Sequence, residues 1–323
     1  MKIFITRVIP DRGVNLLRHA GHTVDINPED RVLSHDELIL SLQKDAYGAV
    51  LCDLDDKIDP AVLDAAGPQC KIFANYAVGY DNLDLPAMAQ RGIAATNTPG
   101  VLTNAVAEHA LGLLLGIAHR IPEADRYTRA GKFTSWGPTL LLGSDVSGRT
   151  LGIVGLGRIG SRVAHHAARG FDMPIVYYDV KRSEEFEKSY RAAYRKNVDD
   201  VFAEADYISI HVPLLPTTRH LVDASRLALM KKSAYLINTS RGAVIDETAL
   251  VAALQNGAIR GAALDVYEHE PALTPGLADL ENVILTPHIA SATEETRQAM
   301  SEIAAQNILA VLDGRIPPNV IKG

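Results

Sequence analysis

Three charged residues, each placed just beyond an apolar run, mark the last third of the chain. Arg241 follows "AYLINTS", Glu270 follows "GAALDVY", and His288 closes "NVILTPH". Such a set suits the reduction of a keto acid. A histidinium donates a proton to the carbonyl oxygen, a carboxylate orients the ring, and an arginine binds the substrate carboxylate. We predict that Arg241 binds an anionic substrate and that His288 is the proton donor.

Arg241 and His288 each have a plainer interpretation. Arg241 can form a surface ion pair with Asp246 or Glu247, which follow it closely in "SRGAVIDE". His288 can be an ordinary histidine beside a proline turn. The residue types alone leave these alternatives open.

The acid that would orient the histidine is also ambiguous, because Glu268 and His269 stand next to Glu270. Spacing does not choose among them, although Pro271 stiffens the chain after Glu270. A metal site made of these three residues is disfavoured. Alternate residues of an extended segment point in opposite directions, and the sequence shows no second cluster of ligands.

A glycine-rich turn opens the second half of the chain. Gly155, Gly157 and Gly160 form G-x-G-x-x-G directly after the apolar run "TLGIVGL". The first glycine permits a tight turn, the second a close approach of pyrophosphate, and the third close packing of helix on strand. The amides of Arg158 and Ile159 would then face phosphate at a helix N-terminus. Glycine turns without a ligand show the same pattern, but the strand before it favours dinucleotide binding.

Asp179 ends the next apolar run, "MPIVYYD", about twenty residues past the glycines, where an acid binds the adenosine ribose. A carboxylate there repels a 2′-phosphate, so we expect NAD(H) to be preferred. Lys181 and Arg182 follow, and they are either solvated surface residues or a site for the phosphate of NADP(H). Some use of NADPH is therefore also expected.

These residues need parallel sheets to position them. Strand and helix signals alternate over residues 1–98, and Pro99-Gly100 marks a boundary. From residue 150 a second series has six expected strands, and a helix expected over about 293–312 returns to the first series. We predict an α/β fold with two doubly wound parallel sheets. The predicted domains are 1–99 plus 290–323 for substrate and 100–289 for the dinucleotide.

Composition narrows the range of functions. The chain has 323 residues, a net charge of −7 and 47% hydrophobic residues, which is typical of an acidic globular protein. This balance argues against a general binder of nucleic acid or membranes. Two cysteines, Cys52 and Cys70, are too few for a disulfide framework, so we expect a cytoplasmic protein.

Several motifs together resemble one family. "GLGRIG", "INTSRGAVIDE", "ALDVYEHEP" and "LTPHIASAT" are similar to the D-isomer-specific 2-hydroxyacid dehydrogenases, and the resemblance extends over essentially the whole chain. It implies a flavodoxin-like substrate domain with an inserted Rossmann-like cofactor domain. It also implies that Glu270, rather than Glu268 or His269, is the partner of His288.

The resemblance assigns further residues. Leu54 and the amides of Val78 and Gly79 would bind the substrate. Trp136 is either a specificity residue presented to a partner subunit or an anchor of a dimer arm. The cofactor would contact Thr103, Gly155, Gly157, Arg158, Ile159, Asp179, Val180, Lys181, Arg182, Val212, Pro213, Thr239, Arg241, Asp265, His288 and Ala290.

The predicted activity is NAD(P)H-dependent reduction of glyoxylate and hydroxypyruvate by a homodimer, with no metal. "NYAVGYDNLDL" and "NTPGVLT" resemble the glyoxylate/hydroxypyruvate reductases most. One alternative is a broad D-2-hydroxyacid or 2-ketogluconate-type dehydrogenase. Another, from a different class, is a corepressor-like scaffold that senses NAD.

Overall fold

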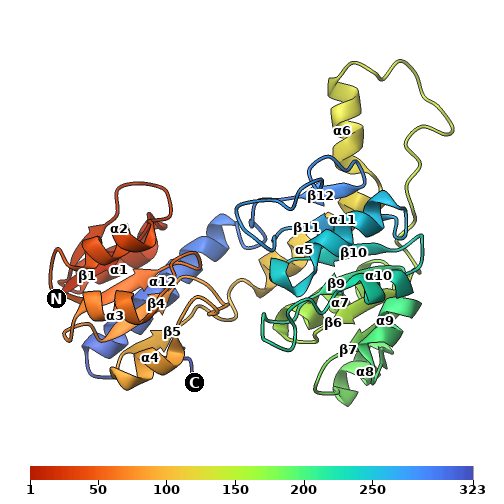
Figure 1. The fold of residues 1–323 in the computed structure, drawn as a ribbon. Helices are drawn as coiled ribbons and strands as arrows, with labels where there is room; N and C mark the ends of the chain where they lie inside the picture. The colour runs from red at the N-terminus through yellow and green to blue at the C-terminus, as the bar shows by residue number, and fades with distance from the viewer. Residues whose placement is uncertain (323) are drawn as a thin grey trace. The chain divides into compact units, whose positions relative to one another are not determined.

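The computed structural model describes residues 1–322 and divides into two compact units (Figure 1). Unit 1 consists of residues 1–102 together with the chain from Ala292 onward, and unit 2 of Thr103–Ser291. Each unit is built on one sheet in which all strand pairs are parallel. The predicted fold class is therefore confirmed.

Unit 1 has a five-stranded sheet in the order β2-β1-β3-β4-β5. Its strands are β1 (Lys2–Ile5), β2 (Thr23–Ile26), β3 (Tyr47–Cys52), β4 (Ile72–Asn75) and β5 (Ala94–Thr96). Its helices are α1 (Asp11–His19), α2 (His35–Leu42), α3 (Pro60–Ala66), α4 (Leu85–Gln90) and α12 (Glu294–Leu312). Apolar side chains of α2, α3 and α4 pack with the sheet in one buried cluster.

Local sequence explains where these helices begin. Ser34 and Glu37 form a capping box at α2, and the carboxylate of Asp59 accepts two N–H groups at the start of α3, where Pro60 is the first residue. The late helix α12 packs against α1. A Cβ on Gly13 would lie 2.1 Å from the carbonyl oxygen of Ser301, so only glycine permits this approach.

Unit 2 has a seven-stranded sheet in the order β12-β11-β10-β9-β6-β7-β8. Its strands are β6 (Leu151–Val154), β7 (Ile175–Tyr178), β8 (Ala193–Tyr194), β9 (Tyr207–Ile210), β10 (Tyr235–Asn238), β11 (Gly261–Leu264) and β12 (Val283–Leu285). Its helices are α5 (Thr103–Ala118), α6 (Ile121–Arg129), α7 (Arg158–Gly170), α8 (Glu184–Tyr190), α9 (Val198–Glu204), α10 (Ala224–Leu229) and α11 (Glu247–Gln255).

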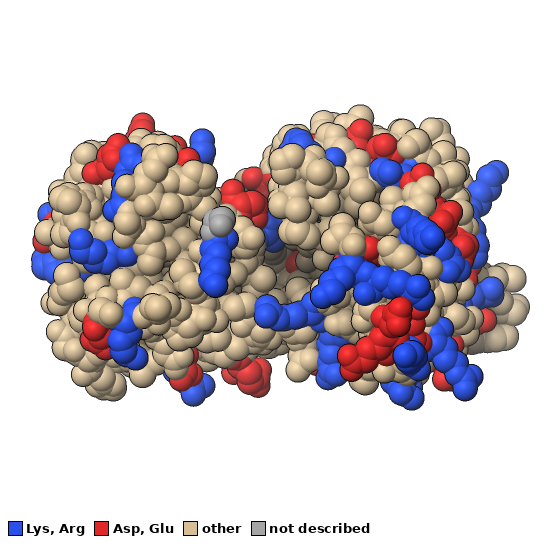
Figure 2. Space-filling model, turned by 90° about the horizontal axis from the view of Figure 1, so that it is seen from below, with Lys and Arg blue, Asp and Glu red and all other residues tan. Residues whose placement is uncertain are grey.

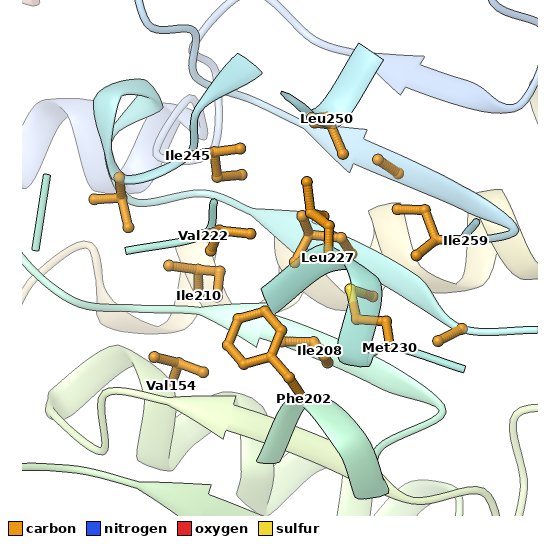
Figure 3. Packing of buried hydrophobic residues seen from close by; sticks show 14 of the residues in the cluster. Val154, Phe202, Ile208, Ile210, Val222, Leu227, Met230, Ile245, Leu250 and Ile259 are labelled. Atoms are coloured by element: carbon orange, nitrogen blue, oxygen red, sulfur yellow. The ribbon is translucent and has the colours of Figure 1, made fainter. Parts of the chain in front are cut away.

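The sheet of unit 2 buries both faces. Successive strand residues point to opposite sides, so Ile153 packs with α5 and α7 while Val154 packs with α9, α10 and α11. Figure 3 shows the second of these clusters, in which Phe202 and Leu227 meet Ile208 and Ile210. This double burial explains why these strands read as uninterrupted apolar runs.

The expected count of six strands in unit 2 is wrong by one. The additional strand, β8, has only two residues and lies at the sheet edge. Two residues are too few to produce an apolar run or an alternation. Elsewhere in unit 2, α6 and the segment after it extend away from the sheet (Figure 1).

None of the helices within residues 1–322 is both long and apolar enough to cross a bilayer. On the face of unit 2 seen in Figure 2, basic side chains lie beside acidic ones. In unit 2, Arg182 and Glu187 are joined by two hydrogen bonds of 2.8 and 2.7 Å.

Candidate active site

The three strands that precede the predicted catalytic residues are neighbours in the sheet. Asn238 of β10 pairs with Leu264 of β11, and Leu264 pairs with Leu285 of β12. Parallel strands all end at the same edge, so the chain beyond each of them emerges side by side. Arg241 and His288 follow the outer two of these strand ends.

The turn after Arg241 lies directly against the segment that carries Glu270. A Cβ on Gly242 would fall 1.8 Å from the carbonyl carbon of Tyr267, so no other residue fits there without a shift of the backbone. The carbonyl of Arg241 accepts a hydrogen bond from the side chain of Asn238 at 2.9 Å. These backbone contacts therefore fix the position of the main chain at Arg241.

His288 and Glu270 form a direct pair. Nδ1 of His288 lies 2.9 Å from Oε2 of Glu270, and about a quarter of each side chain is exposed (27% and 26%). An ionised carboxylate only accepts, so Nδ1 carries the proton and Nε2 is left for a substrate. His288 adopts φ 51°, in the left-handed region, and its N–H donates to the carbonyls of Asp265 and Thr286.

The neighbouring acid has other partners. Oε1 of Glu268 lies 2.5 Å from Nε2 of His220 and 3.4 Å from Arg219, and its side chain is only 9% exposed. The carboxylate of Glu247 accepts the N–H of Glu268 and the hydroxyl of Thr274. The geometry therefore pairs His288 with Glu270 and not with Glu268.

Asp265 anchors the segment around His288. It is fully buried, and its carboxylate accepts Thr286 Oγ1 at 2.6 Å and the N–H groups of Ile289 and Ala290 at 2.8 Å each. Burial alone would raise the pKa of Asp265, but His109, whose Nε2 lies 3.5 Å away, and these donors hold it below its ordinary value. Sequence reasoning missed the contact of His109 with Asp265, since the two residues lie far apart along the chain.

The glycine turn has the geometry that a pyrophosphate requires. Gly155 has φ 96°, and a Cβ on Gly160 would lie 2.1 Å from the carbonyl oxygen of Gly155. A Cβ on Gly157 would meet nothing within 4 Å. Helix α7 begins at Arg158 without a side-chain cap, so the first-turn N–H groups, including that of Ile159, are left for an acceptor.

Asp179 follows β7 and is half-buried. Its two oxygens accept the N–H of Leu156 at 2.7 Å and that of Lys181 at 2.8 Å. Carboxylate oxygens have further lone pairs, so ribose hydroxyls can still donate to them. Val180 is 94% exposed, and Lys181 and Arg182 are exposed beside it.

The remaining predicted cofactor residues lie in unit 2 as well. Thr239 directly follows β10, and its buried hydroxyl has no hydrogen-bond partner among the described residues, as expected of an atom that a ligand would satisfy. Val212 follows β9 and is half-buried, Pro213 beside it is exposed, Thr103 begins α5, and Ala290 is buried. The glycine turn, Asp179 and this hydroxyl together fit a dinucleotide.

The other predicted substrate residues have different settings. In unit 1, Leu54 lies in the loop after β3, and Val78 and Gly79 lie in the loop after β4, half-buried. Trp136 lies in the segment after α6 and is 81% exposed. Within residues 1–322 no group of three or more His, Cys, Asp or Glu side chains is arranged to hold a metal ion.

Comparisons with known proteins agree with this geometry. Residues 111–290 match the family model "D-isomer specific 2-hydroxyacid dehydrogenase, NAD binding domain". A glyoxylate reductase of Thermofilum pendens is 46% identical over 99% of this chain and 94% of its own length. The chain belongs to the D-isomer-specific 2-hydroxyacid dehydrogenases. The family predicted from the four motifs is confirmed, and the enzyme is an oxidoreductase that uses NAD(H) or NADP(H).

Solved structures of relatives support the same family. A protein of Thermus thermophilus superimposes on the enzyme with a TM-score of 0.93 at 41% identity, and all of both chains is covered. An NADPH-dependent glyoxylate/hydroxypyruvate reductase of Sinorhizobium meliloti, crystallised with NADP and malonate, gives a TM-score of 0.86 at 32% identity, covering 99% of this chain and 96% of that one.

Proposed function

We propose that the enzyme reduces small 2-keto acids, with glyoxylate and hydroxypyruvate first, to the corresponding 2-hydroxy acids. The observation that carries the proposal is the contact of 2.9 Å between Nδ1 of His288 and Oε2 of Glu270. His288 follows a strand that ends at the same sheet edge as the strand before Arg241. The names of the relatives, glyoxylate reductase and glyoxylate/hydroxypyruvate reductase, favour these two substrates.

Each residue has a distinct task in the proposed reaction. The bound nicotinamide supplies the hydride. His288 donates a proton from Nε2 to the carbonyl oxygen as negative charge develops there, and Glu270 holds the ring and stabilises its charged form. Arg241 polarises the carbonyl and binds the substrate carboxylate, and the backbone N–H groups of Val78 and Gly79 also donate hydrogen bonds to that carboxylate. Leu54 would contact the substrate, and Trp136 would affect its selection.

We propose that NADH is preferred over NADPH. The carboxylate of Asp179 suits the two ribose hydroxyls and repels a 2′-phosphate. Arg182, one of the two cations that follow Asp179, is engaged by Glu187 through two hydrogen bonds and is less available to that phosphate. Lys181 is exposed beside Asp179 and supports a lower activity with NADPH.

Steady-state assays test the substrate and the cofactor together. The consumption of NADH and of NADPH would be followed with glyoxylate, hydroxypyruvate, pyruvate and 2-ketogluconate. We expect the highest kcat/KM with NADH and either of the first two acids. A strong preference for NADPH would contradict the cofactor proposal, and a preference for 2-ketogluconate would favour the broad dehydrogenase instead.

The same assay separates an enzyme from a scaffold. A corepressor-like scaffold that senses NAD would bind the dinucleotide but oxidise it with none of the four acids. We expect turnover, because the pair of His288 with Glu270 is oriented by several hydrogen bonds that nucleotide binding alone does not need.

We further propose that the enzyme is a cytoplasmic homodimer. The segment that extends from unit 2 exposes several large apolar side chains, which suits a surface covered by a second copy. These are Ile121, Phe133, Trp136 and Leu142, each at least 55% exposed. Light scattering would measure the mass in solution, and a monomer at micromolar concentration would contradict the proposal. Two free buried cysteines, Cys52 and Cys70, are in keeping with the cytoplasm.

A further inference from the structure

The peptide groups at Val78 and Gly79 are held on their carbonyl sides. The N–H of Thr98 donates to the carbonyl of Ala77 at 2.9 Å, and Nδ2 of Asn97 donates to the carbonyl of Val78 at 2.8 Å. In a trans peptide the C=O and the N–H that follows it point in opposite directions. The N–H groups of Val78 and Gly79 therefore point away from Asn97 and Thr98, which follow β5.

Those two N–H groups are left for a ligand. Neither donates a hydrogen bond to a backbone carbonyl within residues 1–322, whereas the carbonyls of Ala77 and Val78 are both satisfied. Val78 and Gly79 are half-buried, so solvent or a small anion can reach them. Consecutive N–H groups of this kind suit an anion.

Asn97 is itself fixed from behind by α12. Its carbonyl accepts a hydrogen bond from Nδ2 of Asn307 at 3.2 Å, and its N–H donates to the carbonyl of Asn319 at 3.3 Å. Asn307 is fully buried on α12. The main chain of Asn97, whose side-chain amide donates to the carbonyl of Val78, is therefore held in place by two hydrogen bonds.

Two more asparagines extend this support. Nδ2 of Asn75 donates to the carbonyl of Gly79 at 2.9 Å, and its side chain also contacts Asn82. Nδ2 of Asn82 in turn donates to the carbonyls of Asp53 and Asp56 at 2.9 and 3.0 Å. The loop after β3 and the loop after β4 are thus joined by side-chain amides.

We propose that Asn97 is a positioning residue for the substrate carboxylate, because its side-chain amide sets the direction of the Gly79 N–H. The inference rests on the proposed function, in which that N–H binds a 2-keto acid. Without the donor, the carbonyl of Val78 loses its partner and the peptide between Val78 and Gly79 can rotate. Substrate affinity should fall while the proton donor in unit 2 is unchanged.

The test compares a charged and a neutral substrate. Asn97→Ala and Asn97→Asp would be assayed with glyoxylate and with methyl glyoxylate, whose ester carries no charge. We expect the alanine variant to lose about 10- to 100-fold in kcat/KM for glyoxylate, mainly through KM, since a hydrogen bond to a charged group is misaligned. We expect the aspartate variant, of equal size, to lose more, because its carboxylate repels the Val78 carbonyl. With the ester, both variants should resemble wild type.

A matched control separates positioning from stability. Asn27 in unit 1 is also buried, and its Nδ2 donates to the carbonyls of Thr6 and Glu29 at 3.1 and 3.2 Å. Asn27→Ala should lower the melting temperature without a selective effect on glyoxylate. NADH binding, followed by fluorescence, should be the same in all variants.

The outcomes decide between the claims. An unchanged KM for glyoxylate in the folded Asn97→Asp variant would overturn the inference, and so would an equal loss with the ester. Either result leaves the proposed function standing as long as the wild type turns over glyoxylate. A wild type that reduces no keto acid would overturn the proposed function, and the inference with it.

Discussion

Unit 2 contains two histidine–glutamate pairs whose acids are two residues apart, and they differ in their surroundings. Glu270 accepts the N–H of Tyr267 and the ring of His288, and 26% of its side chain is exposed. Glu268 accepts from His220, Arg219 and the N–H of Glu247, and only 9% of its side chain is exposed. The same residue types thus form a partly exposed pair in one place and a nearly buried, more extensively hydrogen-bonded pair in the other.

This difference shows that a histidine–glutamate pair alone does not identify an active site. His288 follows β12 at the sheet edge where the chain after β10, with Arg241 and the unsatisfied hydroxyl of Thr239, also emerges. His220 uses its Nε2 on Glu268 and so joins the loop after β9 to the start of α11. Which ring nitrogen the acid takes, and what else the acid binds, separate the two roles.

The largest expected effect comes from replacing each histidine by alanine. His288→Ala should lower kcat by about 100- to 10,000-fold, because the developing alkoxide loses its proton donor. His220→Ala should leave kcat close to that of wild type. Steady-state and single-turnover kinetics with glyoxylate measure both. Comparable losses in the two variants would remove the distinction between the pairs.

A smaller effect is expected from the anchor of the His288 segment. Asp265→Asn should lower the free energy of unfolding at pH 7 by about 2 kcal/mol, since a buried carboxylate loses charge-assisted hydrogen bonds. The pKa of Asp265 is below its ordinary value, so this stability is present above the unfolded pKa and is lost as the pH falls through the folded one. Urea unfolding between pH 7 and pH 3 should therefore show the two proteins converging only under acid conditions.

Asp223→Asn is the control for that experiment. Asp223 caps α10 near the surface, with 42% of its side chain exposed. Its replacement should cost less stability than that of Asp265 and leave kcat unchanged. If the advantage of wild type over Asp265→Asn did not shrink at all as the pH fell below the pKa of an unfolded aspartate, the assigned charge state of Asp265 would be wrong.

The smallest effects come from converting each acid to its amide. Glu268→Gln should lower the free energy of unfolding by about 1 kcal/mol and change kcat little, because a nearly buried carboxylate loses charge-assisted bonds to Arg219, His220 and the N–H of Glu247. Glu270→Gln should do the reverse, with kcat reduced about 10-fold and an almost unchanged melting temperature. Calorimetry and kinetics on both variants measure this, and a crossed result would refute the assignment.

Much of the fold could be predicted because its signals are local. Buried parallel strands appear as apolar runs, and Ser34 and Asp59 mark helix starts through bonds made within a few residues. The strand β8 could not be predicted, since two edge residues carry no pattern. The glycine turn could be predicted because its glycines meet local requirements of the backbone.

The types of residue in the candidate site could be predicted from the sequence. Which side chains contact one another could be predicted less well. Spacing could not choose between Glu268 and Glu270, because the choice depends on where His220 and His288 arrive from distant parts of the chain. The link of His109 to Asp265 was invisible for the same reason. Long-range pairs of this kind leave no periodicity in a sequence.

The return of α12 to unit 1 also sets an order for synthesis. Unit 2 consists of one continuous stretch, so its sheet can close while the ribosome is still at work. The first hundred residues must wait, because the helix that packs on α1 and carries Asn307 is translated only after unit 2. During that interval the apolar side of the nascent sheet in unit 1 lacks its cover, and it is there that we expect chaperones to bind.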